Sequence, residues 1–312
     1  MSKCELQLKI KINKFSITCL LILNNGKIAS GTSEGSIVVF NNKSYSDSFA
    51  IKEHKKSVTS LIQSKKIYLN NIISSSKDST IKIFQICNNS YKIIQIIENF
   101  NKISKFMELN LCFNDFCSCS DDGTLKLFSL NKNKEIKDKI INEDFIFNFN
   151  EPIINMIETN KDEIVSIFSY NNHFLKFLNI KNKSSKKTII NISVIGNNSI
   201  CLFNKKYLII GGSYMITVID IFDYSKQIID TNSWKIYTII NYDDKYIFYS
   251  DDDSSIYFCE LIIDNSFEIM LKKIFCHKLF SSSILIMIFA KQKKRIITGG
   301  INSTINILNL FT

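Results

Sequence analysis

The sequence predicts an all-β fold of seven repeated units, and this prediction rests on a recurring phrase, on its spacing and on its turns. A β-rich run, a tight polar turn and a second β-rich run follow one another seven times in 312 residues. The first apolar residues after these turns lie 44, 44, 49, 42, 40 and 49 residues apart, at Ile37, Ile81, Leu125, Phe174, Ile216, Ile256 and Ile305. Asp-Gly and Ser-rich turns between alternating apolar runs indicate hairpins. A period of about 40–45 residues with four strands per repeat is typical of the blades of a β-propeller.

Each repeat is expected to hold four strands, because further β-rich runs flank the phrase. Inner strands are expected before it and outer strands after it, for example at residues 57–62, 199–203, 235–240, 91–97 and 268–274. The last repeat lacks an outer strand of its own, whereas residues 1–12 alternate polar and apolar side chains as a strand does. We therefore predict a single domain over residues 1–312, a seven-bladed β-propeller of four-stranded antiparallel blades whose ring is closed by residues 1–12 as the outer strand of the last blade.

The composition is that of an ordinary globular protein. Hydrophobic residues make up 45% and charged residues 22% of the chain. No run approaches the roughly 18 apolar residues of a membrane span, and residues 1–12 lack the basic start and apolar core of a signal peptide. The nine cysteines lack the spacing of a small disulfide framework, which favours reduced thiols. We expect an intracellular protein, cytoplasmic or nuclear.

The second repeat carries polar residues at informative places. His54 lies four residues before Val58, Ser74 falls on the expected second strand and Asp78 occupies the following turn. This arrangement resembles the WD-repeat family, and the resemblance covers essentially the whole chain. It implies a buried hydrogen-bond network of His, Ser, Asp and a third-strand Trp, which Phe84 replaces here. It also implies a structural rather than a catalytic role for these residues.

The other repeats match the family pattern less closely. Asp122 and Asp253 hold the turn position of the third and sixth repeats, and the resemblance assigns both to such a network. The remaining turn positions hold Glu34, Asn171, Ser213 and Asn302. No repeat has Trp at the third-strand place, although a chain with 24 Phe and 1 Trp reflects a bias that AT-rich codons would produce. Because Phe has no N–H to donate, each network is one hydrogen bond shorter, worth about 0.5–1.5 kcal/mol.

No constellation in the sequence predicts catalysis, a metal site or a cofactor. There are 3 His, and two of them precede expected inner strands, where a structural hydrogen bond is the simpler interpretation. Cys112, Cys117 and Cys119 form no Cys-x-x-Cys pair, so core packing is favoured over zinc binding. Residues 251–253, three consecutive Asp, are interpreted as a solvated turn rather than a cation site. We predict a protein that is not an enzyme and that uses no cofactor.

The charge pattern allows two interpretations. The formal net charge is +10, and basic residues concentrate in the connections between first and second and between third and fourth strands. They are Lys65, Lys66, Lys132, Lys134, Lys181, Lys183, Lys186, Lys187, Lys205, Lys206, Lys291, Lys293, Lys294 and Arg295. One rim should therefore be basic and the other mixed to acidic. Codon bias on a solvated surface explains this pattern, and so does a face for RNA, anionic lipid or an acidic protein segment.

Two functions from different classes follow. The resemblance favours a scaffold or adaptor that binds other proteins and assembles a multiprotein complex. The alternative is a component of a ribonucleoprotein assembly, concerned with ribosome maturation or RNA processing, that uses the basic rim on phosphates. The sequence names no partner.

Overall fold

The fold is known from a computed structural model that describes most of the chain. The described residues are 3–12, 14–41, 48–67, 70–98, 101–112, 114–131, 140–160, 162–170, 172–192, 194, 199–263, 268–278 and 283–311. Two positions named in the sequence analysis, the basic pair at 132 and 134 and the fourth turn at 171, lie outside them. Packing divides the chain into two compact units, residues 18–190 and residues 1–17 with 191–312. The single-domain assignment therefore stays a prediction.

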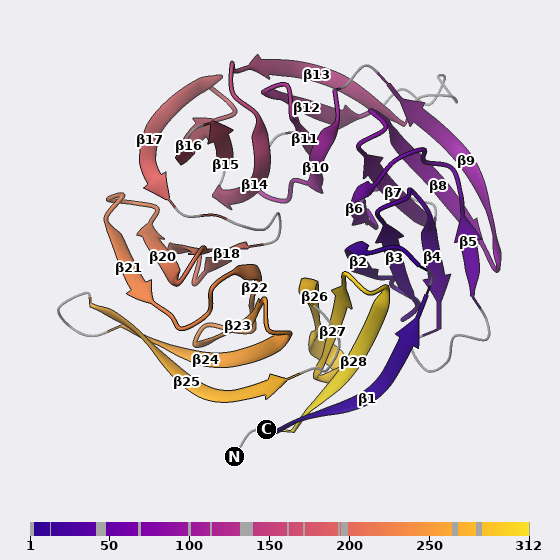
Figure 1. Ribbon diagram of the computed structural model, residues 1–312. Helices are drawn as coiled ribbons and strands as arrows, with labels where there is room; N and C mark the ends of the chain where they lie inside the picture. The colour runs from indigo at the N-terminus through magenta and orange to yellow at the C-terminus, as the bar shows by residue number, and fades with distance from the viewer. Residues whose placement is uncertain are drawn as a thin grey trace. The chain divides into compact units, whose positions relative to one another are not determined.

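The unit of residues 18–190 contains four antiparallel sheets of four strands, each formed by consecutive strands (Figure 1). Blade 1 contains β2 (Ile17–Ile22), β3 (Ile28–Thr32), β4 (Ile37–Phe40) and β5 (Phe49–Ile51). Blade 2 contains β6 (Val58–Ile62), β7 (Asn71–Ser76), β8 (Ile81–Cys87) and β9 (Ser90–Ile97). Blade 3 contains β10 (Ile103–Glu108), β11 (Phe116–Ser120), β12 (Thr124–Leu130) and β13 (Ile141–Asn148). Blade 4 contains β14 (Ile153–Asn160), β15 (Glu163–Tyr170), β16 (Asn172–Asn179) and β17 (Ser184–Ile192).

The unit of residues 1–17 and 191–312 contains three further sheets of the same kind. Blade 5 contains β18 (Ile200–Phe203), β19 (Tyr207–Gly211), β20 (Met215–Asp220) and β21 (Lys226–Asp230). Blade 6 contains β22 (Ile236–Asn241), β23 (Tyr246–Asp251), β24 (Ser255–Ile263) and β25 (Ile269–Lys278). Blade 7 contains β26 (Ile284–Ala290), the 3-10 helix η1 (Lys291–Lys293), β27 (Arg295–Gly300), β28 (Thr304–Phe311) and β1 (Lys3–Lys11). The predicted seven four-stranded blades are confirmed.

The N-terminal strand completes blade 7, as predicted. Figure 1 shows β1 alongside β28, and the antiparallel register runs from Lys3 opposite Phe311 to Lys11 opposite Thr304. The amide of Ile12 continues the pairing by donating to the Ser303 carbonyl at 3.0 Å. The two ends of the sequence therefore belong to one sheet.

The core lies between successive blades rather than inside each one. Second strands such as β7 and β11 are buried along their whole length, whereas outer strands such as β21 alternate exposed and half-buried residues. One apolar cluster joins Ile37 and Val39 of blade 1 to Val58, Ile72 and Phe84 of blade 2. Similar clusters join blades 2 and 3, 3 and 4, 5 and 6, and 6 and 7. A blade thus depends on its neighbour, because burying one large apolar side chain contributes roughly 1.5–3 kcal/mol.

The turns between second and third strands need a left-handed residue, which explains the Asp-Gly signal in the sequence. Gly123 has φ +83°, and a Cβ there would lie 2.2 Å from the Phe149 carbonyl oxygen. Ser79, Ser254 and Ser303 take the same conformation in blades 2, 6 and 7, with φ of 76°, 62° and 65°. The polar turn residues on either side can therefore direct their side chains back towards the blade.

Two glutamines tie outer strands of neighbouring blades together. The side-chain amide of Gln227, on β21, donates to the Ile269 carbonyl at 3.0 Å, and its oxygen accepts from the Ile269 amide at 2.9 Å. Gln95, on β9, does the same on β13: it donates to the Ile141 carbonyl at 2.8 Å and accepts from the Ile141 amide at 2.9 Å. These contacts add polar links to the apolar packing between blades 5 and 6 and between blades 2 and 3.

Helices contribute little to the described part of the chain. The only one there, η1, has three residues. No helix within the described ranges is long and apolar enough to cross a membrane.

Candidate functional site

Blade 2 holds a compact polar network at the end of its second strand. His54 lies in the connection from β5 to β6, Ser74 on β7 and Asp78 in the turn from β7 to β8. The His54 Nε2 atom lies 2.6 Å from Ser74 Oγ, and Nδ1 lies 2.9 Å from Asp78 Oδ2. Because an ionised carboxylate only accepts hydrogen bonds, Nδ1 of a neutral His54 carries the proton and Nε2 accepts from the serine hydroxyl. The three residues named from the family resemblance thus lie within one hydrogen-bonded chain.

The Asp78 carboxylate is held in its ionised form. Burial alone would raise its pKa, but hydrogen bonds from His54, Thr80 and the Lys55 amide outweigh that effect. Thr80 Oγ1 donates to Oδ1 at 2.7 Å, and the Lys55 amide donates to Oδ2 at 2.9 Å. Together they hold the pKa of Asp78 well below its usual range. The side chains of His54 and Asp78 are 0% and 7% exposed, so the network presents little to a partner.

Blades 3 and 4 retain a serine at the second-strand position of Ser74, but in the described part of the chain this serine has no hydrogen-bond partner like His54. Ser118 and Ser166 lie opposite Lys126 and Lys176 on the third strand, just as Ser74 lies opposite Lys82. Both serines are buried, at 1% and 0% exposure, and neither hydroxyl has a hydrogen-bond partner within the described structure. These two serines were not predicted from the sequence; the available signal was a serine on a second strand without a His before the inner strand.

In blade 4, Ser166 lacks a partner among the described residues because a phenylalanine takes the place of the histidine. Phe149 lies four residues before Ile153, as His54 lies four residues before Val58, so a phenyl ring occupies the histidine place. The ring cannot hydrogen-bond Ser166. It lies 4.7 Å from the Lys176 ammonium instead and packs edge-on against Phe168 at 5.1 Å between centroids.

These serines allow a direct comparison of paired and unpaired hydroxyls. Ser166→Ala is expected to leave the free energy of unfolding unchanged or to raise it by about 1 kcal/mol, because a buried unsatisfied hydroxyl is removed. Ser74→Ala should lower it by about 1–2 kcal/mol, because it leaves His54 Nε2 buried without a donor. Urea denaturation of both variants measures the difference. Equal destabilisation by the two substitutions would show that Ser166 has a partner.

The aspartates of blades 3 and 6 differ from one another. Asp122 accepts from the Thr124 amide at 2.9 Å and from the Ser120 hydroxyl, and these bonds lower its pKa against the raising effect of burial. Asp253 is exposed, and in its place Asp251 points inward. Asp251 Oδ1 accepts from the Ser255 amide at 3.0 Å. The structure therefore places the network carboxylate of blade 6 at Asp251, because this residue replaces the serine found two positions before the turn aspartate in blade 2.

The basic residues of the 18–190 unit do not all lie on connections. Lys65 and Lys66 follow β6, and Lys66 pairs with Asp115 at 2.9 Å. Lys186 and Lys187 were expected on a loop but lie within the outer strand β17. Lys186 pairs at 2.8 Å with Glu163, whose side chain is 2% exposed. Two of these four lysines thus already neutralise carboxylates of their own chain.

In the other unit, Lys205 and Lys206 connect β18 to β19, and Lys293 and Lys294 lie between β26 and β27. Lys206 pairs with Asp220 at 3.1 Å, while Arg295 begins β27 and donates from Nε to the Asn309 side chain at 2.9 Å. Intramolecular pairing again uses part of the predicted basic face.

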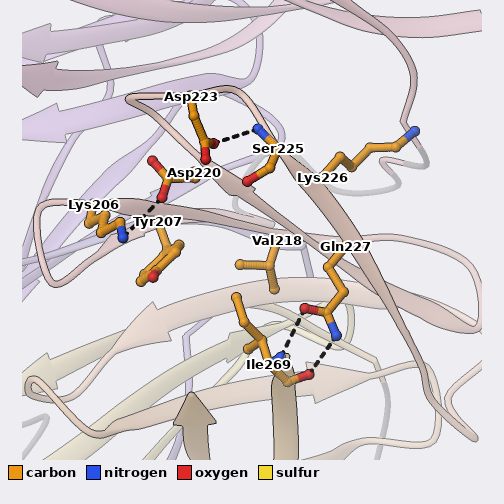
Figure 2. A pocket seen from close by; sticks show the side chains of 9 residues that line it. All are labelled: Lys206, Tyr207, Val218, Asp220, Asp223, Ser225, Lys226, Gln227 and Ile269. Carbon is orange, nitrogen blue, oxygen red and sulfur yellow. Dashed lines mark hydrogen bonds and ion pairs between the residues drawn. The ribbon is translucent and has the colours of Figure 1, made fainter. Parts of the chain in front are cut away.

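A pocket of about 420 Å³ opens beside Lys206 in blade 5 (Figure 2). Tyr207, Val218 and Ile269 give it an apolar part, and Gln227 reaches across it to the Ile269 backbone. Two lysines and two aspartates line the rest, namely Lys206, Lys226, Asp220 and Asp223. Since these charges balance, the pocket has no preference for an anion.

None of the described residues form a group of three or more His, Cys, Asp or Glu side chains that could hold a metal. Burial raises the pKa of the Cys119 thiol to about 12, and that of Cys117 well above its usual value. These two thiols are therefore un-ionised near neutral pH and poor nucleophiles. They pack in the core, where the Cys117 and Met156 sulfurs lie 3.2 Å apart.

Four-stranded blades, one of them with a buried His–Ser–Asp network, are typical of a β-propeller of the WD type. A family model described as "WD domain, G-beta repeat" matches residues 46–85, which contain this network. No curated protein matches the chain. The match and the seven repeated blades together support a protein of the WD-repeat family.

Proposed function

We propose that this protein is a non-enzymatic scaffold that assembles other proteins into a complex, in the cytoplasm or the nucleus. WD40 propellers are generally protein-interaction scaffolds. The proposal rests on where the polar side chains lie in the described structure. The polar cluster around His54 is buried and presents little to a partner, so recognition falls to exposed turns and outer strands.

Affinity purification of the tagged chain from its own cells, followed by mass spectrometry of co-purifying proteins, tests the proposal. A defined set of proteins, retained at physiological salt and absent from an unrelated tagged propeller, is the expected result. Recovery of the chain alone would contradict the scaffold function.

The ribonucleoprotein alternative makes a different prediction, which three exposed lysines can test. Lys65, Lys205 and Lys293 are exposed. Replacing all three with Ser should leave the melting temperature nearly unchanged, because exposed charges contribute little to stability. If these lysines contact single-stranded RNA, the slope of log affinity against log salt should fall by about 0.7 per phosphate contact. We expect no such change, measured by fluorescence anisotropy with a labelled oligonucleotide; a lower slope would favour RNA as the partner.

A further inference from the structure

Four large apolar side chains are exposed at one end of blades 5, 6 and 7. Tyr214 and Trp234 are each 55% exposed, Ile301 is 47% exposed and Phe15 is 39% exposed. Each lies in a connection from second to third strand or from the outer strand of one blade to the inner strand of the next. In four-stranded antiparallel sheets these connections leave from the same end. We call these four residues the apolar row.

Backbone hydrogen bonds hold the first two members of the apolar row together. The Tyr214 amide donates to the Ser233 carbonyl at 3.1 Å, and the Thr231 amide donates to the Tyr214 carbonyl at 2.6 Å. The turn of blade 5 is thereby fixed against the connection that carries Trp234. Tyr214 is thereby held beside the segment that carries Trp234, the single Trp of the chain.

The contacts continue from this connection to blade 7. Lys235 and Asp252 exchange two hydrogen bonds, from the Lys235 amide to Oδ1 and from the Asp252 amide to the Lys235 carbonyl, both 3.1 Å. The Ser283 hydroxyl donates to the Asp252 carbonyl at 3.3 Å, and the Ile301 amide donates to the Ser283 carbonyl at 3.2 Å. Ser16 Oγ donates to the Ile301 carbonyl at 3.0 Å, beside Phe15. A chain of hydrogen bonds thus links the segments that carry the apolar row within this unit.

Two carboxylates lie in the middle of this surface. Asp251 takes the inward position in blade 6, where its carboxylate accepts from the Asp253 and Ser255 amides, and Asp253 is exposed. Asp252 is half-buried. The Trp234 ring accepts a cation within this chain, since the Lys235 ammonium lies 4.7 Å from the ring centroid. The Asp252 carboxylate accepts from the amide of Lys235, which follows Trp234, whereas exposed Lys14 lies at the far end, next to Phe15.

We propose that Tyr214, Trp234, Asp252 and Asp253 dock a basic segment of a partner protein in which Arg or Lys alternates with apolar residues. The apolar side chains of the partner segment cover the apolar row. A guanidinium of the same segment stacks on an aromatic ring of the row while it pairs with a carboxylate of Asp252 or Asp253. Tyr and Trp are the side chains most often found to dominate binding energy at interfaces. Phosphate is repelled by the carboxylates, which disfavours RNA here. This inference rests on the proposed scaffold function and names the chemistry of one of its partners.

Fluorescence anisotropy with a panel of labelled 12-residue peptides tests the proposal. In the panel, Arg or Lys alternates with Leu, Val or Phe, and in matched controls Glu replaces each basic residue. At physiological salt at least one basic peptide should bind tenfold or more tightly than its Glu control. Trp234→Ala, and separately Asp252→Lys with Asp253→Lys, should each reduce that affinity at least tenfold. If no basic peptide exceeds its control, or if these variants bind as the wild type does, the proposal is overturned.

The chain offers a matched control at the opposite end of blade 5. Phe222, which is 68% exposed, and Asp223 lie in the connection from β20 to β21. Phe222→Ala with Asp223→Lys removes the same kinds of groups and should leave peptide affinity unchanged; an equal loss would contradict the assignment.

Purification with the docking variants separates the docking proposal from the scaffold proposal. A protein set identical to that of the wild type would refute the docking surface and leave the scaffold function standing, whereas an empty set from the wild type refutes the scaffold function.

Discussion

Deletion of residues 1–12 is expected to produce a protein that aggregates or melts far below the full chain. Ile10 and Ile12, 5% and 6% exposed, lose their buried positions. Each contributes roughly 1.5–3 kcal/mol, against a total stability of about 5–15 kcal/mol for a typical domain. In addition, β28 loses β1 along one side and becomes an edge strand, although it keeps β27 on the other side; an exposed apolar edge strand pairs readily with other chains. Size-exclusion chromatography and thermal melting measure both effects.

Point variants separate loss of the strand from loss of single side chains. Ile10→Ala should lower the free energy of unfolding by about 2–4 kcal/mol, because it leaves a cavity in the core. Leu6, on the same strand but 42% exposed, is the control, and Leu6→Ala should change stability much less. A truncated chain that stays monomeric with an unchanged melting temperature would show that blade 7 does not depend on β1.

Asp78→Ala is expected to lower the free energy of unfolding at neutral pH by about 1–3 kcal/mol. The substitution leaves His54, Thr80 and the Lys55 amide without their acceptor in a buried site. Asp122→Ala should cost less, since the Asp122 carboxylate accepts from a shorter turn network that contains no histidine. Urea denaturation of the two variants gives the comparison, and equal, negligible effects would contradict a stabilising role for the network.

The same network predicts a pH dependence. Since the folded-state pKa of Asp78 is lowered, its contribution to stability is present above the unfolded-state pKa of about 3.9 and is lost as the pH falls below that value. The stability difference between the wild type and Asp78→Ala should therefore shrink as the pH falls below about 4. A difference that grows below about pH 4 would contradict the assignment.

The period of the repeat was sufficient to predict the fold, because propeller blades need neighbours at a fixed interval along the chain. The spacing of Ile37, Ile81 and Leu125 located three blades, and the alternation of residues 1–12 predicted the strand that completes blade 7. Local patterns carry such information, since they depend on strand periodicity and on turn conformation.

The details of the polar sites depend on competition between neighbouring groups, which a pattern does not encode. In blade 6, three consecutive aspartates offer three candidate acceptors, and the turn geometry selects Asp251 over Asp253. The distribution of lysine charge was similarly uncertain, because Lys186 pairs with a glutamate 23 positions earlier in the chain. Those partners become apparent only when the strands are placed side by side.

The side chains of Gln95 and Gln227 act as one-residue substitutes for a β-strand. A glutamine amide presents one donor and one acceptor, the same pair of groups that a peptide unit offers to an adjacent strand. At Ile141, the first residue of β13, and at Ile269, the first residue of β25, the free edge is therefore already occupied. A foreign strand cannot begin pairing at the first residue of β13 or at the first residue of β25 without displacing a glutamine. Self-association through these edges is thereby hindered from the first hydrogen bond, although both strands are long enough to template it.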